Sequence, residues 1–167
     1  MFERLLIGVI CAIAFPASSL AQNTVFVVRH AERADSGTGA PAMMATDPDL
    51  SEAGRARAAS LAIVLKDAQI SAIFVTEFRR TQQTAAPLAK SLGITPTVVS
   101  SKDMAELTTR LKKAHGNALV VGHSNTVPDV IAALGVPTPV SVSDTEFDQL
   151  FVVTSGSPPR VIQLRYR

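Results

Sequence analysis

The chain has 167 residues, of which 47% are hydrophobic and 18% charged, and its formal net charge at pH 7 is +2. This is an ordinary globular composition, and the length suits a single domain. The basic residues are scattered, with no run longer than Lys112-Lys113 or Arg79-Arg80, and the chain has only seven Phe, one Tyr and no Trp. This pattern argues against a nucleic-acid-binding protein, which would concentrate basic and aromatic residues.

The first segment is typical of a cleaved export signal. Residues 1–4 include one arginine and precede an apolar stretch over residues 5–15, and small residues then stand at Ser19 and Ala21. The stretch is well short of the roughly 20 apolar residues that span a bilayer, which argues against a membrane anchor. We therefore expect a signal peptide over residues 1–21, a secreted, periplasmic protein, and a mature domain over residues 22–167. Cleavage would also remove Cys11, the only cysteine.

Apolar runs and helical stripes alternate along the next part of the chain, which predicts strands joined by helices. Strands are predicted over residues 24–28, 71–75, 97–99 and 118–121, and helices over residues 79–92, 104–114 and 126–134 and from Ser51 through the stripe that ends at Ala68. The segment from Arg33 to Pro48 is rich in Gly, Ala, Asp and Pro, and we expect it to form a loop over a crevice, where it could select substrates.

The last two apolar runs cover residues 150–153 and 161–164. The connection Ser155-Gly156-Ser157-Pro158-Pro159 is too short for a parallel crossover, so these runs are predicted to form an antiparallel hairpin. The order of elements predicts a three-layer α/β/α sandwich with a mostly parallel sheet and an antiparallel edge.

Two of the predicted strands each end in a histidine. The run over residues 24–28 is followed by Arg29-His30-Ala31-Glu32, and the run over residues 118–121 by Gly122-His123-Ser124. If these strands are parallel, both imidazoles share the crevice at the carboxyl edge of the sheet, where open α/β sheets bind their ligands. An arginine beside a histidine repels a metal cation but suits an anion such as phosphate. The pattern therefore predicts phosphoryl transfer without a metal.

Four segments resemble, in order, the signatures of the histidine phosphatase superfamily, which includes phosphoglycerate mutases and acid phosphatases. They are Arg29-His30-Ala31-Glu32, Asp47-Pro48-Asp49-Leu50-Ser51-Glu52-Ala53-Gly54, Thr76-Glu77-Phe78-Arg79-Arg80-Thr81-Gln82-Gln83-Thr84-Ala85 and Val121-Gly122-His123-Ser124. The third is similar to the family pattern Ser-x-x-x-Arg-x-x-Gln-Thr-Ala, with Thr76 in place of serine. The resemblance implies a phosphoglycerate mutase-like fold.

The same resemblance implies roles for individual residues. His30 is expected to be the nucleophile that becomes a phosphohistidine, because a neutral imidazole has a free lone pair at pH 7. Arg29, Arg80 and His123 are expected to bind the phosphoryl oxygens, whereas Arg79 is expected to face solvent. Glu32 is expected either to orient the backbone at the start of the loop or to be an ordinary exposed carboxylate.

The general acid is not identified by the sequence. Some family members carry an Asp directly after the second histidine, but here Ser124-Asn125 follows. Others use a carboxylate after the third strand, where Asp103 and Glu106 are the candidates, although both also suit the first turn of a helix. If neither acts, substrates with good leaving groups, such as phosphohistidine, phosphoramidate or acyl phosphate, are favoured because they need less proton donation.

The expected function is that of a metal-independent phosphatase without a cofactor, acting on a small phosphomonoester or a related phosphoryl compound. A mutase is less expected, because the chain lacks the length for large insertions that would enclose an intermediate. The alternative is a phosphate-ligand-binding protein of the same fold with little or no turnover. A metal-dependent hydrolase using His30, Glu32 and His123 is disfavoured by the two arginines. The substrate and the oligomeric state stay open.

Overall fold

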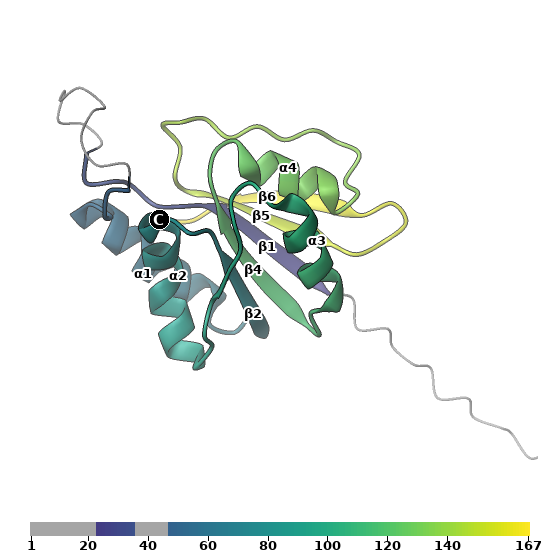
Figure 1. The fold of residues 1–167 in the computed structure, drawn as a ribbon, viewed down its shortest axis with the longest axis horizontal. Helices are drawn as coiled ribbons and strands as arrows, with labels where there is room; N and C mark the ends of the chain where they lie inside the picture. The colour runs from purple at the N-terminus through teal and green to yellow at the C-terminus, as the bar shows by residue number, and fades with distance from the viewer. Residues whose placement is uncertain (1–22, 36–46) are drawn as a thin grey trace, which may run out of the picture.

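Figure 1 shows the computed structural model of the chain, which describes residues 23–35 and 47–167. The predicted signal peptide and most of the predicted loop between Arg33 and Pro48 lie outside these residues. The elements are β1 (Thr24–Arg29), α1 (Glu52–Leu65), β2 (Ile70–Val75), α2 (Arg79–Leu92), β3 (Thr97–Val98), α3 (Met104–Lys113), β4 (Asn117–Gly122), α4 (Thr126–Ala133), β5 (Gln149–Thr154) and β6 (Arg160–Arg165).

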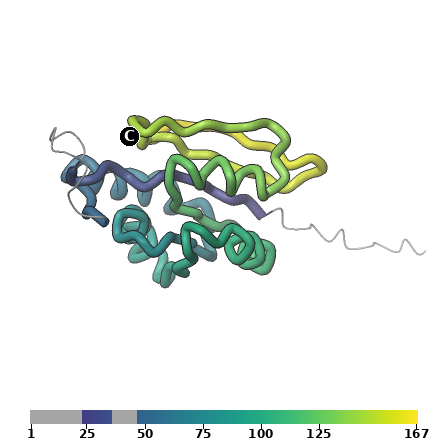
Figure 2. Tube along the Cα trace, turned by 45° about the horizontal axis from the view of Figure 1, so that its top comes forward, coloured from purple at the N-terminus to yellow at the C-terminus, as the bar shows by residue number. Residues whose placement is uncertain are grey.

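The strands form one sheet with the order β3-β2-β4-β1-β5-β6. The pairs β2/β3, β2/β4 and β1/β4 are parallel, whereas β1/β5 and β5/β6 are antiparallel. In Figure 2 the yellow β5/β6 hairpin runs beside the purple β1. The mostly parallel sheet with an antiparallel edge is confirmed, and so is the terminal hairpin.

The helices cover the sheet in two pairs, with α1 packed on α2 and α3 on α4. Because side chains alternate across a strand, β1 contributes to two hydrophobic clusters. Val25 and Val27 pack with Leu107 of α3 and Val130 of α4, whereas Val28 packs with residues of α1 and α2. This is the predicted three-layer arrangement. Within the described part of the chain, no helix is both long and apolar enough to cross a membrane.

The first turn of α1 is tied to the segment that follows β1. Ser51 caps the helix, its Oγ accepting a hydrogen bond from Gly54 N at 3.0 Å, and Ser51 N donates to Glu32 O at 2.9 Å. A Cβ at Gly54 would lie 2.2 Å from Glu32 O, so only glycine allows this approach. The helix ends at Leu65, before the end of its apolar stripe, and Ala68 lies in the turn toward β2. The residues after β1 are thereby fixed against α1.

Candidate active site

The two strand-end histidines lie side by side because β1 and β4 are parallel neighbours. Arg29 is in register with Gly122, and His30 N donates to Gly122 O at 2.9 Å. The ring centroids of His30 and His123 are 5.3 Å apart, and both rings are buried. The structure therefore places the two predicted histidines in one site at the carboxyl edge of the parallel strands.

The histidines line a cavity of about 390 Å³ that carries an excess of positive charge. Its described lining includes Arg29, Arg33, Arg80 and Lys102, and Asp144 as the one acidic side chain. Arg33 is paired with a neighbouring aspartate, whereas the guanidinium groups of Arg29 and Arg80 are largely buried. Fixed cations in a partly desolvated cavity favour an anionic ligand.

Arg29 is held by the irregular loop that precedes β5. Its Nη1 donates to Ser143 O at 2.8 Å and to Glu146 O at 3.2 Å, and its guanidinium carbon lies 4.2 Å from the ring centroid of Phe147. Burial is the largest of several causes that act on the pKa of Arg29, and it lowers that pKa. A guanidinium in a protein nevertheless stays charged. Neutral carbonyls and an aromatic face thus hold the cation in place without cancelling its charge.

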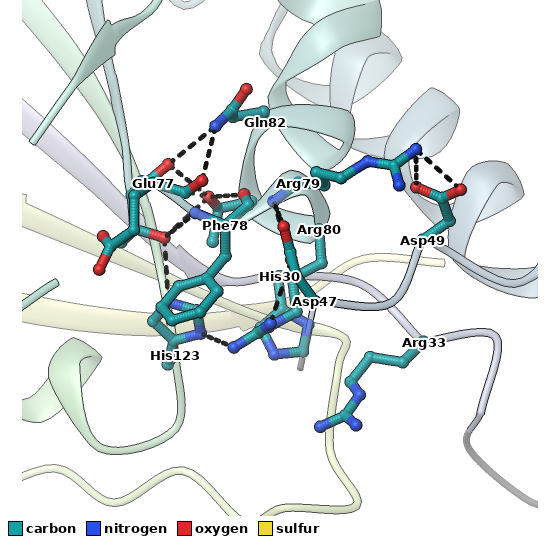
Figure 3. Close-up of polar contacts among 12 residues, drawn as sticks. His30, Arg33, Asp47, Asp49, Glu77, Phe78, Arg79, Arg80, Gln82 and His123 are labelled. Atoms are coloured by element: carbon teal, nitrogen blue, oxygen red, sulfur yellow. Dashed lines mark hydrogen bonds and ion pairs between the residues drawn. The ribbon is translucent and has the colours of Figure 1, made fainter. Parts of the chain in front are cut away.

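Arg80 enters the cavity from the first turn of α2, and its neighbour Arg79 does not. The Arg80 side chain is 12% exposed, its Nη1 lies 3.5 Å from Asp47 Oδ1, and it stacks 4.2 Å from the ring centroid of Phe78. The Arg79 side chain is 60% exposed and pairs with Asp49 (Figure 3). Asp47 also accepts from Arg79 N at 3.0 Å, so one carboxylate caps α2 and orients Arg80.

His30 has one ring nitrogen committed to the backbone. Its Nδ1 lies 2.8 Å from Ala31 O, and a carbonyl can only accept, so Nδ1 carries the proton and Nε2 keeps its lone pair. Burial lowers the pKa of His30 to about 3, against the hydrogen bond to Ala31, which raises it, and the charge of Arg29 adds a smaller lowering. The ring is therefore neutral near pH 7, which a nucleophilic imidazole requires.

His123 is held through both ring nitrogens. Its Nε2 lies 3.0 Å from Thr76 Oγ1, and its Nδ1 lies 3.5 Å from Arg80 Nη2 (Figure 3). Burial and then the charge of Arg80 lower the pKa of His123 to about 4. The Phe78 ring meets this imidazole edge to face, at 5.2 Å between centroids. Both histidines are thus neutral rings in a cationic cavity.

Glu32 faces away from this cavity and belongs to the scaffold. Its carboxylate accepts hydrogen bonds from Nε and Nη2 of Arg57 on α1, the shortest at 2.6 Å. Burial, the largest single cause, would raise the pKa of Glu32, but the hydrogen bonds and charge of Arg57 together with a backbone hydrogen bond outweigh it, and the pKa is lowered. Glu32 is therefore neither a free exposed carboxylate nor a metal ligand beside the histidines. It secures the end of β1 to α1.

The two candidates for the general acid lie on α3 rather than in the cavity. Asp103 is the N-cap of that helix, its Oδ1 accepting from Glu106 N at 2.9 Å, and the Glu106 carboxylate pairs with Arg110. Neither lines the cavity. The first-turn roles that the sequence allowed for both residues are the ones the structure shows.

Several residues of the site were not identified from the sequence. Phe78 follows β2 and Phe147 precedes β5, and Lys102 and Asp144 come from irregular segments without periodicity. Phe78 belongs to the Thr76–Ala85 signature and comes two residues before Arg80, so the sequence could have identified it as a residue of the site. The other three carry no local signal, because tertiary packing alone brings them to the histidines.

No cluster of three or more His, Cys, Asp or Glu side chains in residues 23–35 and 47–167 is placed to hold a metal ion. Of the three residues considered for a metal site, Glu32 is apart from the two histidines, because it pairs with Arg57 while His30 and His123 line the cavity with Arg29 and Arg80. The site as described is built around fixed cations.

Comparison with known proteins agrees with this arrangement. The sequence profile of the histidine phosphatase superfamily (branch 1) matches residues 25–109, which include His30, Arg80 and the segment between them. The chain belongs to this superfamily. No curated protein matches its sequence.

Solved structures of similar fold include the protein histidine phosphatase SixA in complex with tungstate, at 19% identity and a TM-score of 0.66 over 85% of this chain and 96% of that one. The mycobacterial glucosyl-3-phosphoglycerate phosphatase in complex with VO3 is 17% identical, with a TM-score of 0.63 over 86% of this chain and 98% of that one. At these identities the likeness establishes the fold, and the phosphoglycerate mutase-like architecture is confirmed.

The depressed pKa values give a testable pH dependence. An ordinary histidine takes up a proton near pH 6.5, but His30 and His123 are expected to stay neutral from about pH 8 down to about pH 5 in an NMR titration of their ring signals. Because the unfolded chain binds these protons first, each ring should lower the free energy of unfolding by about 1.4 kcal/mol per pH unit from pH 6.5 down to its own pKa, about 3 for His30 and about 4 for His123. A ring that titrates near pH 6.5 would contradict the burial argument.

Proposed function

We propose that the protein is a phosphatase that moves a phosphoryl group from a small phosphorylated substrate to Nε2 of His30 and then to water. The observation that supports this proposal most directly is the state of His30. Its Nδ1 proton is donated to Ala31 O, and its ring lines a cavity together with two buried arginines. Membership of the histidine phosphatase superfamily supports this proposal, as do the phosphatase names of the two structural neighbours.

In the first step the lone pair of His30 Nε2 attacks phosphorus, and the bond from phosphorus to the leaving atom breaks with its electron pair. Charge spreads over the equatorial phosphoryl oxygens, where Arg29 and Arg80 supply donors that are already in position. The Nε of each of these two arginines is buried with no acceptor among the described residues. A bound oxyanion would bring acceptors into a cavity that is rich in donors.

In the second step water attacks the phosphohistidine, the P–N bond breaks toward Nε2, and the proton of the water must be accepted. Asp144, the one carboxylate in the described cavity lining, is our candidate for this base. Its Oδ1 accepts from Ser124 Oγ at 2.6 Å and lies 3.9 Å from Arg29 Nη2. Ser124 follows His123 directly, so the carboxylate is held next to the second histidine although it comes from a distant loop.

Asp144 is the one carboxylate among the described residues that line the cavity, and its side chain is 87% exposed. The described lining therefore holds no buried carboxylic acid that could give a proton to a leaving group. We therefore propose substrates whose leaving group needs little protonation, such as a phosphoramidate or an acyl phosphate. A mutase would have to return the phosphoryl group to an intermediate, and phosphate migration within a monophosphoglycerate without net release would favour that function instead.

The phosphatase proposal is tested first with variants of His30, Arg80 and Arg79. With p-nitrophenyl phosphate and a chelator, His30→Ala should lower phosphate release by about a thousandfold or more, because the covalent route is lost. Arg80→Gln should lower kcat/KM by about a hundredfold, the usual cost of one donor at a developing charge. Arg79→Gln is the matched control and should change kcat/KM by less than about threefold, since its side chain is outside the cavity.

If His30→Ala and the wild-type protein release phosphate equally slowly but both bind phosphate, the protein is a phosphate-binding member of the fold and the phosphatase proposal is wrong. Loss of wild-type activity on chelation would point to a metal-dependent hydrolase.

Asp144→Asn should leave formation of the phosphohistidine almost intact and slow its hydrolysis, so p-nitrophenol should appear in a burst stoichiometric with the enzyme, followed by a kcat lowered by about a hundredfold. Asp129→Asn, on the exposed side of α4, is the control and should show no burst. An Asp144→Asn enzyme with wild-type kcat would exclude this aspartate as the base.

We also propose that the protein acts after export, which rests on the sequence of residues 1–21 alone. Mass spectrometry of the protein recovered from the cell envelope or the medium should find a chain that begins at Gln22. An exported chain that still begins at Met1 would contradict cleavage, and recovery only from the cytoplasm would contradict export.

A further inference from the structure

Behind His123, on the side away from Arg80, lies a pair of buried hydroxyl groups. Thr76 is 7% exposed and Thr81 is fully buried, and their Oγ1 atoms are 3.0 Å apart. Thr76 Oγ1 also lies 3.0 Å from Nε2 of His123. The two threonines thus continue the hydrogen bonding of the imidazole into the protein interior.

The direction of these hydrogen bonds follows from Arg80. A guanidinium has donors only, so the His123 Nδ1 that faces Arg80 Nη2 at 3.5 Å must be the acceptor. In a neutral imidazole the proton then sits on Nε2, which donates to Thr76 Oγ1. Thr76 in turn donates to Thr81 Oγ1, and Thr81 donates to Phe78 O at 2.8 Å.

With the protons placed in this way, every donor and acceptor site of the two hydroxyl groups takes part in a hydrogen bond. A hydroxyl offers one donor and two acceptor sites. Thr76 Oγ1 accepts from His123 Nε2 and from Phe78 N at 3.4 Å, and Thr81 Oγ1 accepts from Thr76 Oγ1 and from Thr76 N at 3.1 Å. The network has no unused group, so a change at its far end would leave a buried polar atom without a partner.

This arrangement leaves a lone pair, not a proton, on the His123 nitrogen that lies beside Arg80. The groups whose charges act on the ring are Arg80 and Arg29, which disfavour a further proton, and Glu77 and Asp47, which favour one. The neutral ring of His30 also lies beside it, as does the uncharged ring of Phe78. A phosphoryl oxygen bound by Arg80 would therefore meet a lone pair unless the ring gained a proton.

We propose that Arg80 and Thr76 together fix the proton of the free protein on Nε2 of His123, with Thr81 supporting Thr76 as the acceptor of that proton. Binding of an oxyanion is coupled to the uptake of one proton at Nδ1. The proton comes from solvent, and no bond other than the new N–H forms or breaks. The resulting imidazolium donates from Nδ1 to the oxyanion and from Nε2 to Thr76, whose hydrogen bonds stay as they are. Thr76 acts through His123 and is a positioning residue.

The first part of this inference is tested on the free protein and does not depend on the proposed function. Long-range 1H–15N spectra distinguish the two imidazole tautomers, and His123 should show a protonated Nε2 and a bare Nδ1. Thr76→Ser keeps the hydroxyl and should give the same pattern. Thr76→Val removes it at nearly equal volume, and the pattern should change to the other tautomer or to a mixture. A wild-type spectrum with the proton on Nδ1 would overturn the assignment. An unchanged Thr76→Val spectrum would show that Arg80 alone fixes the tautomer and would overturn the role given to Thr76.

The second part rests on the proposed anion site and is tested by calorimetry with tungstate, which carries no proton of its own near neutral pH. Titrations in buffers of different ionisation enthalpy count the protons exchanged, and about one should be taken up as the His123 Nδ1 signal becomes that of an N–H. Thr76→Ser should behave like the wild type, and Thr76→Val should bind tungstate about tenfold more weakly.

The outcomes separate the two proposals. Tungstate binding without proton uptake would overturn the coupling and leave the phosphatase proposal standing. Absence of tungstate binding to the wild-type protein would overturn the anion site and, with it, both the coupling and the proposed function. Should Thr76→Val not fold, the wild-type spectrum and the wild-type proton count still decide the two parts of the inference.

Discussion

The parallel pairing of β1 with β4 is the constraint on which the site depends, because it brings His30 and His123 together. Both strands are internal, β1 lying between β4 and β5, so their register is fixed by buried valines on both faces of the sheet. A slip of one residue would turn these side chains to the opposite faces and separate the two histidines. Gly122 is part of the same constraint, because a Cβ there would lie 2.7 Å from Thr126 Oγ1, the atom that accepts from His123 N.

The second constraint is the cost of keeping two guanidinium groups out of water. A buried cation needs partners, and a full carboxylate partner for each would neutralise the site. Arg29 is instead held by two backbone carbonyls, by Phe147 and by one long contact of 3.9 Å to Asp144. Arg80 is held by one long contact to Asp47 and by Phe78. Carbonyls and aromatic faces stabilise a cation without cancelling its charge. The scaffold thus leaves the positive charge free for a ligand.

Most of the fold could be predicted from the sequence, because the signals were local. The apolar runs that became strands, the helical stripes and the short connection before β6 each identify an element without knowledge of the rest. His30 and His123 were found in the same way, as residues just past the ends of buried strands, and Arg80 through its resemblance to a family pattern.

What could not be predicted depends on contacts between distant segments. Phe147 and Asp144 belong to an irregular stretch whose sequence has no period, and only the folded chain brings that stretch to Arg29. The ion pair of Glu32 with Arg57 is a tertiary contact of the same kind. Asp103 shows the reverse case, since its helix-capping role was visible in the sequence and the structure gives it no part in the cavity.

The chemical difference between the two histidines follows from the type of acceptor that each ring contacts. Nδ1 of His30 meets the carbonyl of Ala31, which can only accept, so the nitrogen left for reaction is the same in every protonation state of the ring. Nε2 of His123 meets the hydroxyl of Thr76, which accepts there because Nδ1 of the same ring faces Arg80. Two rings with similarly lowered pKa values therefore present opposite nitrogens to one cavity. A backbone acceptor suits a nucleophile, whose lone pair must not move, and a hydroxyl network suits a ring that gains and loses a proton.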